Sequence, residues 1–185
     1  STGTIQATQN GAIAGGYVGS EEANVKIEAT NYGSIAFASA VNANTGGPSP
    51  GTVTVTSSGL GSFATGRAYA ASSEAATSLI SSGTGSVAMG YAKAGTLQAT
   101  GEASFALGYN VQATADYAYA IGTSFTNNTA STFQVGFGQL DFKVANSAIT
   151  FGSGKAGTDF VLNWDGETND GAITWMEDED YFYFA

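Results

Sequence analysis

Apolar and small residues recur in a fixed order along the first 137 residues of the chain. A window of twelve residues begins at an apolar position, carries a large apolar residue at its ninth position and an alanine at its tenth, and closes on glycine. Seven windows follow this order, two of them with one departure each, so residues 1–137 are predicted to be a repeat domain. The windows begin at Ile5, Ile27, Val55, Ile80, Leu97, Val111 and Phe125, the one from Ile80 being one residue shorter.

The ninth-position residues are candidates for packing in the core or between subunits, and the alanine beside them belongs to the same set. Two windows depart from the pattern, with Gln134 in place of the alanine and Ala38 in place of the closing glycine. The packing candidates of this domain are Ile13, Ile35, Phe63, Val87, Phe105, Tyr119, Phe133 and Ala106.

The end of each window predicts a short β-strand, because its side chains alternate with a period of two. The closing glycine suits a turn that needs positive φ. Successive windows start 22, 28, 25, 17, 14 and 14 residues apart, and about 14 residues suffice for two short strands and two turns. We therefore predict an all-β solenoid of parallel coils, each coil stacked on the last.

One such coil cannot be stable alone. Ordering its backbone costs about 1–2 kcal/mol per residue, whereas burying one large apolar side chain returns only about 1.5–3 kcal/mol. A narrow coil has little interior, so we expect many alanines to be buried against other chains. We infer a homo-oligomer, and threefold symmetry suits a narrow rod best.

The segments GSFATG, GSVAMG and ASFALG, each preceded by an Ile/Val/Leu-x-Ala-Thr-like stretch, resemble the head repeats of YadA-like trimeric adhesins. The resemblance covers about residues 4–137 and implies a left-handed parallel β-roll in a homotrimer. Residues 154–184 look like a C-terminal segment of phage tail-fibre-type proteins. The chain has neither the heptad stalk nor the C-terminal membrane barrel of full trimeric autotransporters, which favours a fibre piece or a processed subunit.

Longer segments separate the early windows, at 17–26, 39–54 and 67–79. In repeat proteins such insertions often form the binding face, so we expect receptor contacts there. Plain solvated loops are the alternative, and 39–54 fits an additional degenerate coil because its spacing of 28 equals two coils. The receptor-contact candidates are Tyr17, Glu21, Arg67 and Tyr69.

Residues 138–185 are predicted to be a second, small module that caps or trimerises the coil. Its runs 160–164, 172–176 and 181–184 read as three strands of a meander, with Trp164 and Trp175 as packing candidates. Such a small aromatic sheet needs a partner surface. The connection 165–171 has the carboxylate spacing of a calcium loop without its glycine and glutamate positions, so it is either an Asx-type turn or a Ca²⁺ site. Residues 177–180 are a solvated turn or a site for a hard cation.

Charge and composition exclude several kinds of chemistry. The chain has no Cys and no His, which removes thiolate chemistry, soft-metal sites and the commonest general base. A net charge of −10 argues against nucleic acid, and no apolar run is long enough to cross a membrane. Residues 159–185 carry eight acids and no base. No cofactor or metal is expected.

The prediction for function is a non-enzymatic structural and attachment protein. A trimeric fibre segment would display loops to a host surface, as in a phage tail fibre, and would be located on a virion or outside a cell. The alternatives are a secreted adhesin or a filament subunit whose rods join end to end, and, less favoured, a fibre-borne polysaccharide depolymerase. The receptor and host are unknown.

Overall fold

A computed structural model describes residues 3–20, 24–43, 51–71, 76–140, 159–164, 171–176 and 180–184. The regular secondary structure in these ranges consists of β-strands, and no helix is assigned in them. The chain divides into two compact units, residues 1–139 and 140–185, whereas the sequence pattern places the boundary between 137 and 138.

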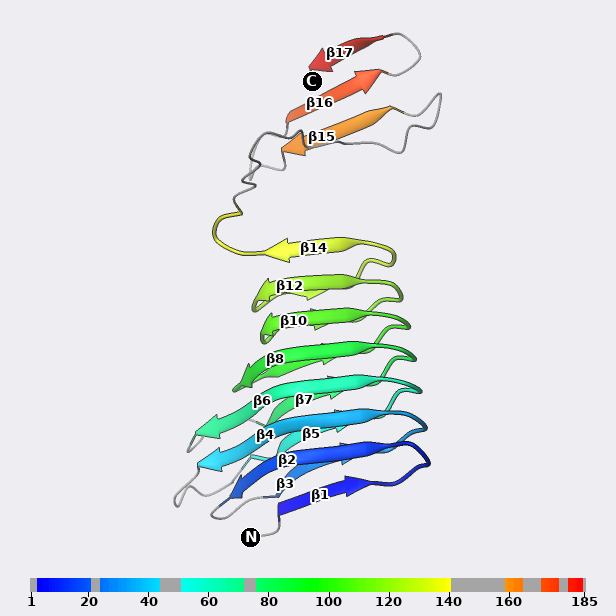
Figure 1. Ribbon diagram of the computed structural model, residues 1–185. Helices are drawn as coiled ribbons and strands as arrows, with labels where there is room; N and C mark the ends of the chain where they lie inside the picture. Colours follow the sequence, from blue (N-terminus) through cyan, green and yellow to red (C-terminus); the bar gives the residue numbers. More distant parts are fainter. Residues whose placement is uncertain are drawn as a thin grey trace, which may run out of the picture. The chain divides into compact units, whose positions relative to one another are not determined.

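The first unit contains two parallel sheets of seven strands each, and successive strands alternate between them (Figure 1). The odd-strand sheet consists of β1 (Gly3–Ala7), β3 (Val25–Ala29), β5 (Val53–Ser57), β7 (Thr77–Ser81), β9 (Thr96–Ala99), β11 (Gln112–Ala113) and β13 (Thr126–Asn127). The even-strand sheet consists of β2 (Ile13–Ser20), β4 (Ile35–Ala43), β6 (Phe63–Ala71), β8 (Val87–Lys93), β10 (Phe105–Tyr109), β12 (Tyr119–Thr123) and β14 (Phe133–Gly136). The predicted all-β fold with stacked parallel strands is confirmed.

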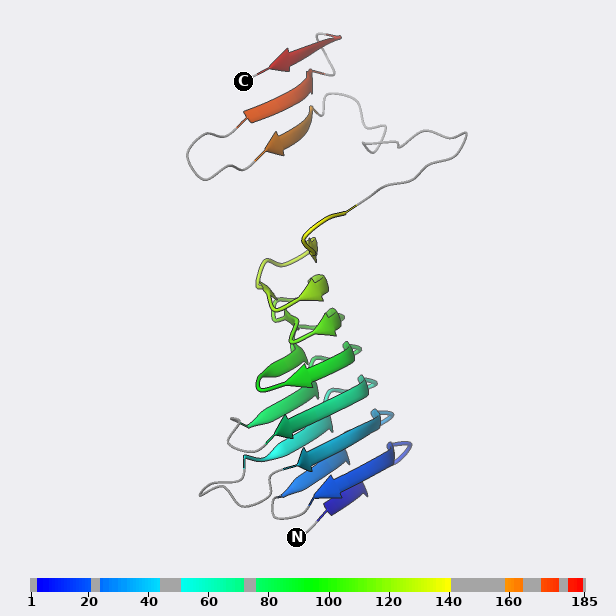
Figure 2. The same cartoon turned by 90° about the vertical axis from the view of Figure 1, so that its left-hand side faces the viewer.

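The register of the strands reproduces the repeat. Phe105 pairs with Tyr119, and Tyr119 pairs with Phe133, so these coils advance by 14 residues each. Earlier coils are longer because their even-numbered strands are longer, up to nine residues in β4 and β6 (Figure 2), and because more residues connect those strands to the next coil. The interpretation of 39–54 as an extra coil is wrong, since its described residues complete β4 and begin β5 of one wide coil.

One window is displaced by a residue from the predicted register. Val55 pairs with Leu79, which pairs with Leu97, so the fourth window begins at Leu79 and has its full twelve residues. Leu79 is fully buried, whereas Ile80 lies half-buried on the outer face. Ser81 shares the inner face with Leu79, and a polar residue at an inward position is what concealed the correct alternation.

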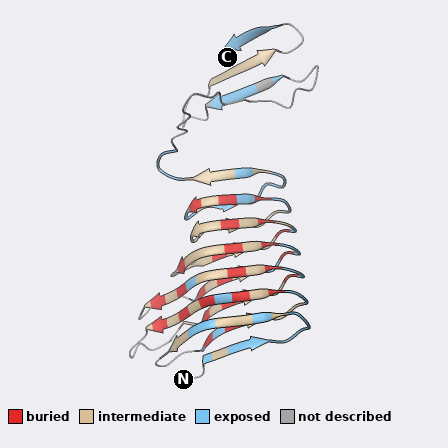
Figure 3. Cartoon of the chain, viewed as in Figure 1, coloured by how far each residue is buried: buried red, intermediate tan, exposed pale blue. Residues whose placement is uncertain are grey.

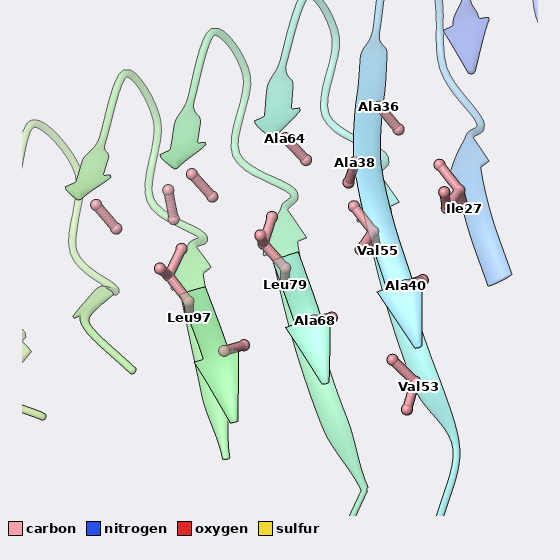
Figure 4. Packing of buried hydrophobic residues seen from close by; sticks show 14 of the residues in the cluster. Ile27, Ala36, Ala38, Ala40, Val53, Val55, Ala64, Ala68, Leu79 and Leu97 are labelled. Carbon is pink, nitrogen blue, oxygen red and sulfur yellow. The ribbon is translucent and has the colours of Figure 1, made fainter. Parts of the chain in front are cut away.

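The core lies between the two sheets of a single chain (Figures 3 and 4). The first residue of each window faces inward from the odd-strand sheet, and the alanine at the tenth position faces inward from the even-strand sheet. Large side chains on one sheet therefore meet small ones on the other, which is how a thin coil reaches close packing. Both sets are fully buried in the central coils: Ile27, Val55, Leu79, Leu97 and Val111 with Ala36, Ala64, Ala88, Ala106 and Ala120.

The expectation that the alanines need other chains for burial is therefore wrong. Ala106 is fully buried within its own chain, between Ala88 and Ala120 in the neighbouring strands. The residues at the first window position fill the interior with aliphatic side chains, so a narrow coil buries its alanines without a second chain.

A buried serine closes the sharp turn between the two sheets in the central coils. The Oγ atoms of Ser62, Ser86 and Ser104 donate to the carbonyl oxygen three residues earlier, at 2.8, 2.7 and 2.7 Å. The Oγ of Ser81 lies 2.7 Å from the Oγ of Ser86 and donates to the backbone carbonyl oxygen of Ser86 at 2.9 Å. No buried side-chain polar atom of the described residues lacks a partner.

Replacing Ser86 with alanine should lower the free energy of unfolding by about 1–3 kcal/mol, because the Gly83 carbonyl and the Ser81 hydroxyl each lose a buried partner. Ser82→Ala is the matched control, since Ser82 is exposed in the same coil. Urea unfolding at fixed chain concentration measures both changes. Equal effects of the two substitutions would show that the buried pair contributes nothing specific.

The prediction that the closing glycines lie in turns is wrong. Gly66, Gly90, Gly108 and Gly122 have φ between 131° and 149°, yet they sit inside strands of the even-strand sheet. A Cβ atom on Gly90 would collide with the backbone carbonyl of Gly108 in the next coil. Glycine is required here because the neighbouring backbone occupies the space of a side chain.

The second unit contains an antiparallel sheet of β15 (Phe160–Trp164), β16 (Gly171–Met176) and β17 (Tyr181–Phe184), in the order of the predicted meander. Trp175 pairs with Phe160 on one side and with Phe182 on the other. The rings of Trp175 and Phe182 are 5.0 Å apart. The side chains of β17 are all exposed, Phe184 by 69%.

Candidate interaction surface

The outer face of the even-strand sheet carries two adjacent columns of mostly apolar side chains, which we call the apolar columns; Gly15 and Thr65 are the exceptions. The first column is formed by the ninth window position, and the second by the eleventh. Their most exposed members are Phe133 at 63%, Phe37 at 59% and Ile13 at 54%. The first column is Ile13, Ile35, Phe63, Val87, Phe105, Tyr119 and Phe133; the second is Gly15, Phe37, Thr65, Met89, Leu107, Ile121 and Val135.

The register of the sheet makes the apolar columns continuous. Neighbours in a column are direct partners of parallel strands, about 4.8 Å apart. The rings of Phe105 and Tyr119 stack with centroids 6.3 Å apart and planes 29° apart. The ninth-position candidates are thus brought together, but on the outside of the coil and apart from its core.

The outer face of the odd-strand sheet is mostly polar, with Ile80 as an apolar exception. The fourth window position is Thr, Ser or Asn in every coil, and Gln98 donates to Gln112 across two strands at 2.8 Å. The two charged residues on the described part of this face, Lys26 and Glu28, pair with each other at 3.5 Å. One outer face is therefore mainly polar and the other mainly apolar.

Three of the four receptor-contact candidates lie in strands, not in loops. Tyr17 is in β2, and Arg67 and Tyr69 are in β6, all on the outer face of the even-strand sheet beyond the glycines. The guanidinium carbon of Arg67 is 4.8 Å from the ring centroid of Tyr69 and 5.7 Å from that of Tyr91. Glu21 is outside the described residues.

Sequence reasoning missed the second apolar column and two further tyrosines. Leu107 and Ile121 stand two positions after the ninth, on the same side of their strands, so the period-two alternation already contained this information. Tyr91 and Tyr109 follow the closing glycine, and the strands continue past that glycine. The assumption of a turn at the glycine concealed both.

The packing candidates of the second unit remain predictions. Trp175 is half-buried in the central strand of its sheet, and the structure gives Trp164 a backbone position opposite Gly171. The carboxylate-rich connections at 165–170 and 177–179, considered above as cation sites, lie outside the described residues.

The described residues contain no group of three or more His, Cys, Asp or Glu side chains that could hold a metal ion. A shallow hollow of about 230 Å³ is lined by Gly95, Asn110 and Phe125, among others. The side-chain amide of Asn110 is already engaged, because it accepts from the Lys93 N–H at 2.9 Å and donates to the Lys93 carbonyl at 2.8 Å.

The titration of one exposed tyrosine is altered at the sharp turns. The hydroxyl of Tyr117 donates to the Glu102 carboxylate at 3.2 Å. This hydrogen bond, followed by the negative charge of Glu102, raises the pKa of Tyr117 above its ordinary value of 10.0. The Tyr117 phenol therefore loses its proton, and with it this hydrogen bond, only at a higher pH than a free tyrosine does.

Comparison with family models, with curated proteins and with solved structures found no match. The resemblance to trimeric adhesin heads and tail-fibre proteins thus remains a prediction from the residues quoted above. In the part of the chain that the structure describes, no helix has the length and apolar character needed to cross a membrane.

Proposed function

We propose that this chain is a non-enzymatic structural and attachment protein that works as a homotrimer, as a segment of a fibre of the phage tail-fibre type. The observation that carries the proposal is the pair of apolar columns on the outer face of the even-strand sheet. The coil has a complete internal core, so the apolar columns are not needed to stabilise a single chain.

The contrast between the two outer faces supports assembly. Monomeric proteins rarely expose large contiguous apolar patches, and such patches mark interaction sites. The apolar columns contain no charged residue from Ile13 to Phe133, as is typical of the centre of a subunit interface. A rod with one apolar face and one polar face buries the apolar face when three copies surround an axis, with the polar faces outward.

The trimer also gives the chain its mechanical role. Parallel strands stacked along an axis form a stiff rod, and three rods side by side resist bending better than one. The proposed left-handed winding follows the resemblance to adhesin heads. An attachment role follows from exposed tyrosine and arginine side chains on a rigid support, where binding costs little conformational entropy.

The native mass in solution tests the proposal. Light scattering of the purified chain, over a hundredfold range of concentration, should give three times the chain mass of 18.6 kDa. A particle of one chain mass at every concentration would refute assembly through the apolar columns.

A further inference from the structure

We propose that the tyrosine–arginine patch beside the apolar columns binds acidic glycans through their carboxylate groups. The patch consists of Arg67, Tyr69, Tyr91, Lys93 and Tyr109. This proposal rests on the proposed attachment function and names the class of receptor that the surface would recognise.

The patch is a single surface built by adjacent strands. Arg67 in β6 pairs with Tyr91 in β8, which pairs with Tyr109 in β10. Tyr69 pairs with Lys93 two residues further along the same strands. The rings of Tyr91 and Tyr109 meet edge to face, with centroids 5.6 Å apart and planes at 69°.

The guanidinium of Arg67 is held in position while remaining accessible in the single chain. It lies near the rings of Tyr69 and Tyr91, at 4.8 and 5.7 Å from their centroids, and the residue as a whole is exposed. A cation over aromatic rings is stabilised by their π electrons and loses side-chain freedom before a ligand arrives. Its planar fork can then receive a carboxylate through two parallel hydrogen bonds.

The charge of the patch is unusual for this chain. Lys and Arg number five against fifteen Asp and Glu, yet two of the five, Arg67 and Lys93, lie here in neighbouring strands. The described outer face of the even-strand sheet contains no acidic residue. A second copy packed through the same face therefore offers these cations no described counter-charge. An anionic partner of another kind would supply the negative charge that Arg67 and Lys93 lack.

The tyrosines indicate what carries the anion. A tyrosine ring presents an apolar face and a hydroxyl tip, which suits sugar rings that have apolar faces bordered by hydroxyl groups. The strand spacing of about 4.8 Å places successive rings within one sugar residue of each other. Nucleic acid fits less well, because its dense phosphate charge meets a chain with a net charge of −10.

The experiment measures retention of the full chain on immobilised glycans. Hyaluronate and polygalacturonate are the acidic probes, dextran is the neutral one, and a single-stranded oligonucleotide tests the alternative anion. Wild type should be retained on at least one acidic glycan and not on dextran. Arg67→Gln should weaken that retention about tenfold or more, as expected for the loss of a charge-assisted pair of hydrogen bonds, and Tyr91→Ala should weaken it as well.

Lys26→Gln is the matched control, because it removes one positive charge from the outer face of the other sheet, and it should change retention less than about twofold. Equal losses for Arg67→Gln and Lys26→Gln, absence of wild-type retention on both acidic glycans, or preference for the oligonucleotide would overturn the proposal.

Light scattering of the same samples separates this inference from the proposed function. A trimer that ignores acidic glycans refutes the ligand and leaves the assembly standing. A monomer whose retention depends on Arg67 refutes the assembly and leaves the ligand standing. If Arg67→Gln itself dissociates the trimer, the patch belongs to the subunit interface and the glycan proposal fails.

Discussion

Replacing Gly90 with alanine should lower the free energy of unfolding by about 3–5 kcal/mol, enough to abolish much of the folded population of a small domain. The added Cβ would meet the backbone carbonyl of Gly108, and a φ of 137° is strained for any residue with a side chain. Neither group can move away without breaking the ladder between β8 and β10. Urea unfolding followed by far-ultraviolet circular dichroism measures the loss.

Gly85→Ala is the control, five residues earlier in the same coil. Gly85 also has a positive φ, 63°, but a Cβ there would meet nothing within 4 Å. It should cost only about 1–2 kcal/mol, the strain of a left-handed backbone alone. The equivalent residues of two later coils, Ala103 and Tyr117, already adopt this conformation with φ of 48° and 56°. If the two variants were equally destabilised, contact between coils would not be the reason for the glycine.

These two glycines show where sequence reasoning reached its limit. The recurrence of glycine at the end of the window was visible, and so was the need for positive φ. The position of this glycine inside a strand was not visible in the sequence. The requirement for glycine comes from a backbone carbonyl of the next coil, which is distant in the sequence. A local pattern can identify an unusual backbone, but the neighbour that imposes it appears only once the coils are stacked.

The same limit applies to the question of which side of each strand faces the core. Alternation in segments such as ASFALG correctly predicted strands, and the recurrence of the window correctly predicted parallel stacking. Alternation alone does not say which side faces inward. Phe105 and Ala106 were both candidates for packing in the core or between subunits. The structure buries Ala106 and places Phe105 on the outer face, because the opposite sheet already fills the interior with Leu97 and Val111.

The candidate surface followed from the sequence in part. Tyr17, Arg67 and Tyr69 were selected as residues of insertions, and the structure places them on the outer face of extended strands. Tyr91 joins Arg67 only because β6 and β8 are aligned in parallel. The window aligns the closing glycines Gly66 and Gly90, and Arg67 and Tyr91 follow them directly. The expectation of a turn at the glycine is what kept these two residues apart.

The reversal of inside and outside yields a sharp prediction for two adjacent residues. Ala106→Glu should prevent folding, since it places a carboxylate in a fully buried site between Ala88 and Ala120, with no space and no counter-charge. The cost is several kcal/mol whatever the state of assembly. Circular dichroism should show loss of β-structure, and light scattering should show no native particle.

Phe105→Glu should instead separate the subunits. In one chain its carboxylate points outward from the even-strand sheet and reaches water, but in the proposed trimer it would be buried in the apolar columns without a partner charge. We expect a β-sheet spectrum close to wild type together with a fall in mass to one chain. Gln98→Glu, which adds the same charge to the polar face of the odd-strand sheet, should leave both mass and spectrum unchanged. If Phe105→Glu keeps the wild-type mass, the first apolar column is not the surface through which the chains associate. If the Phe105→Glu variant loses its β-structure, the coil folds only as it assembles.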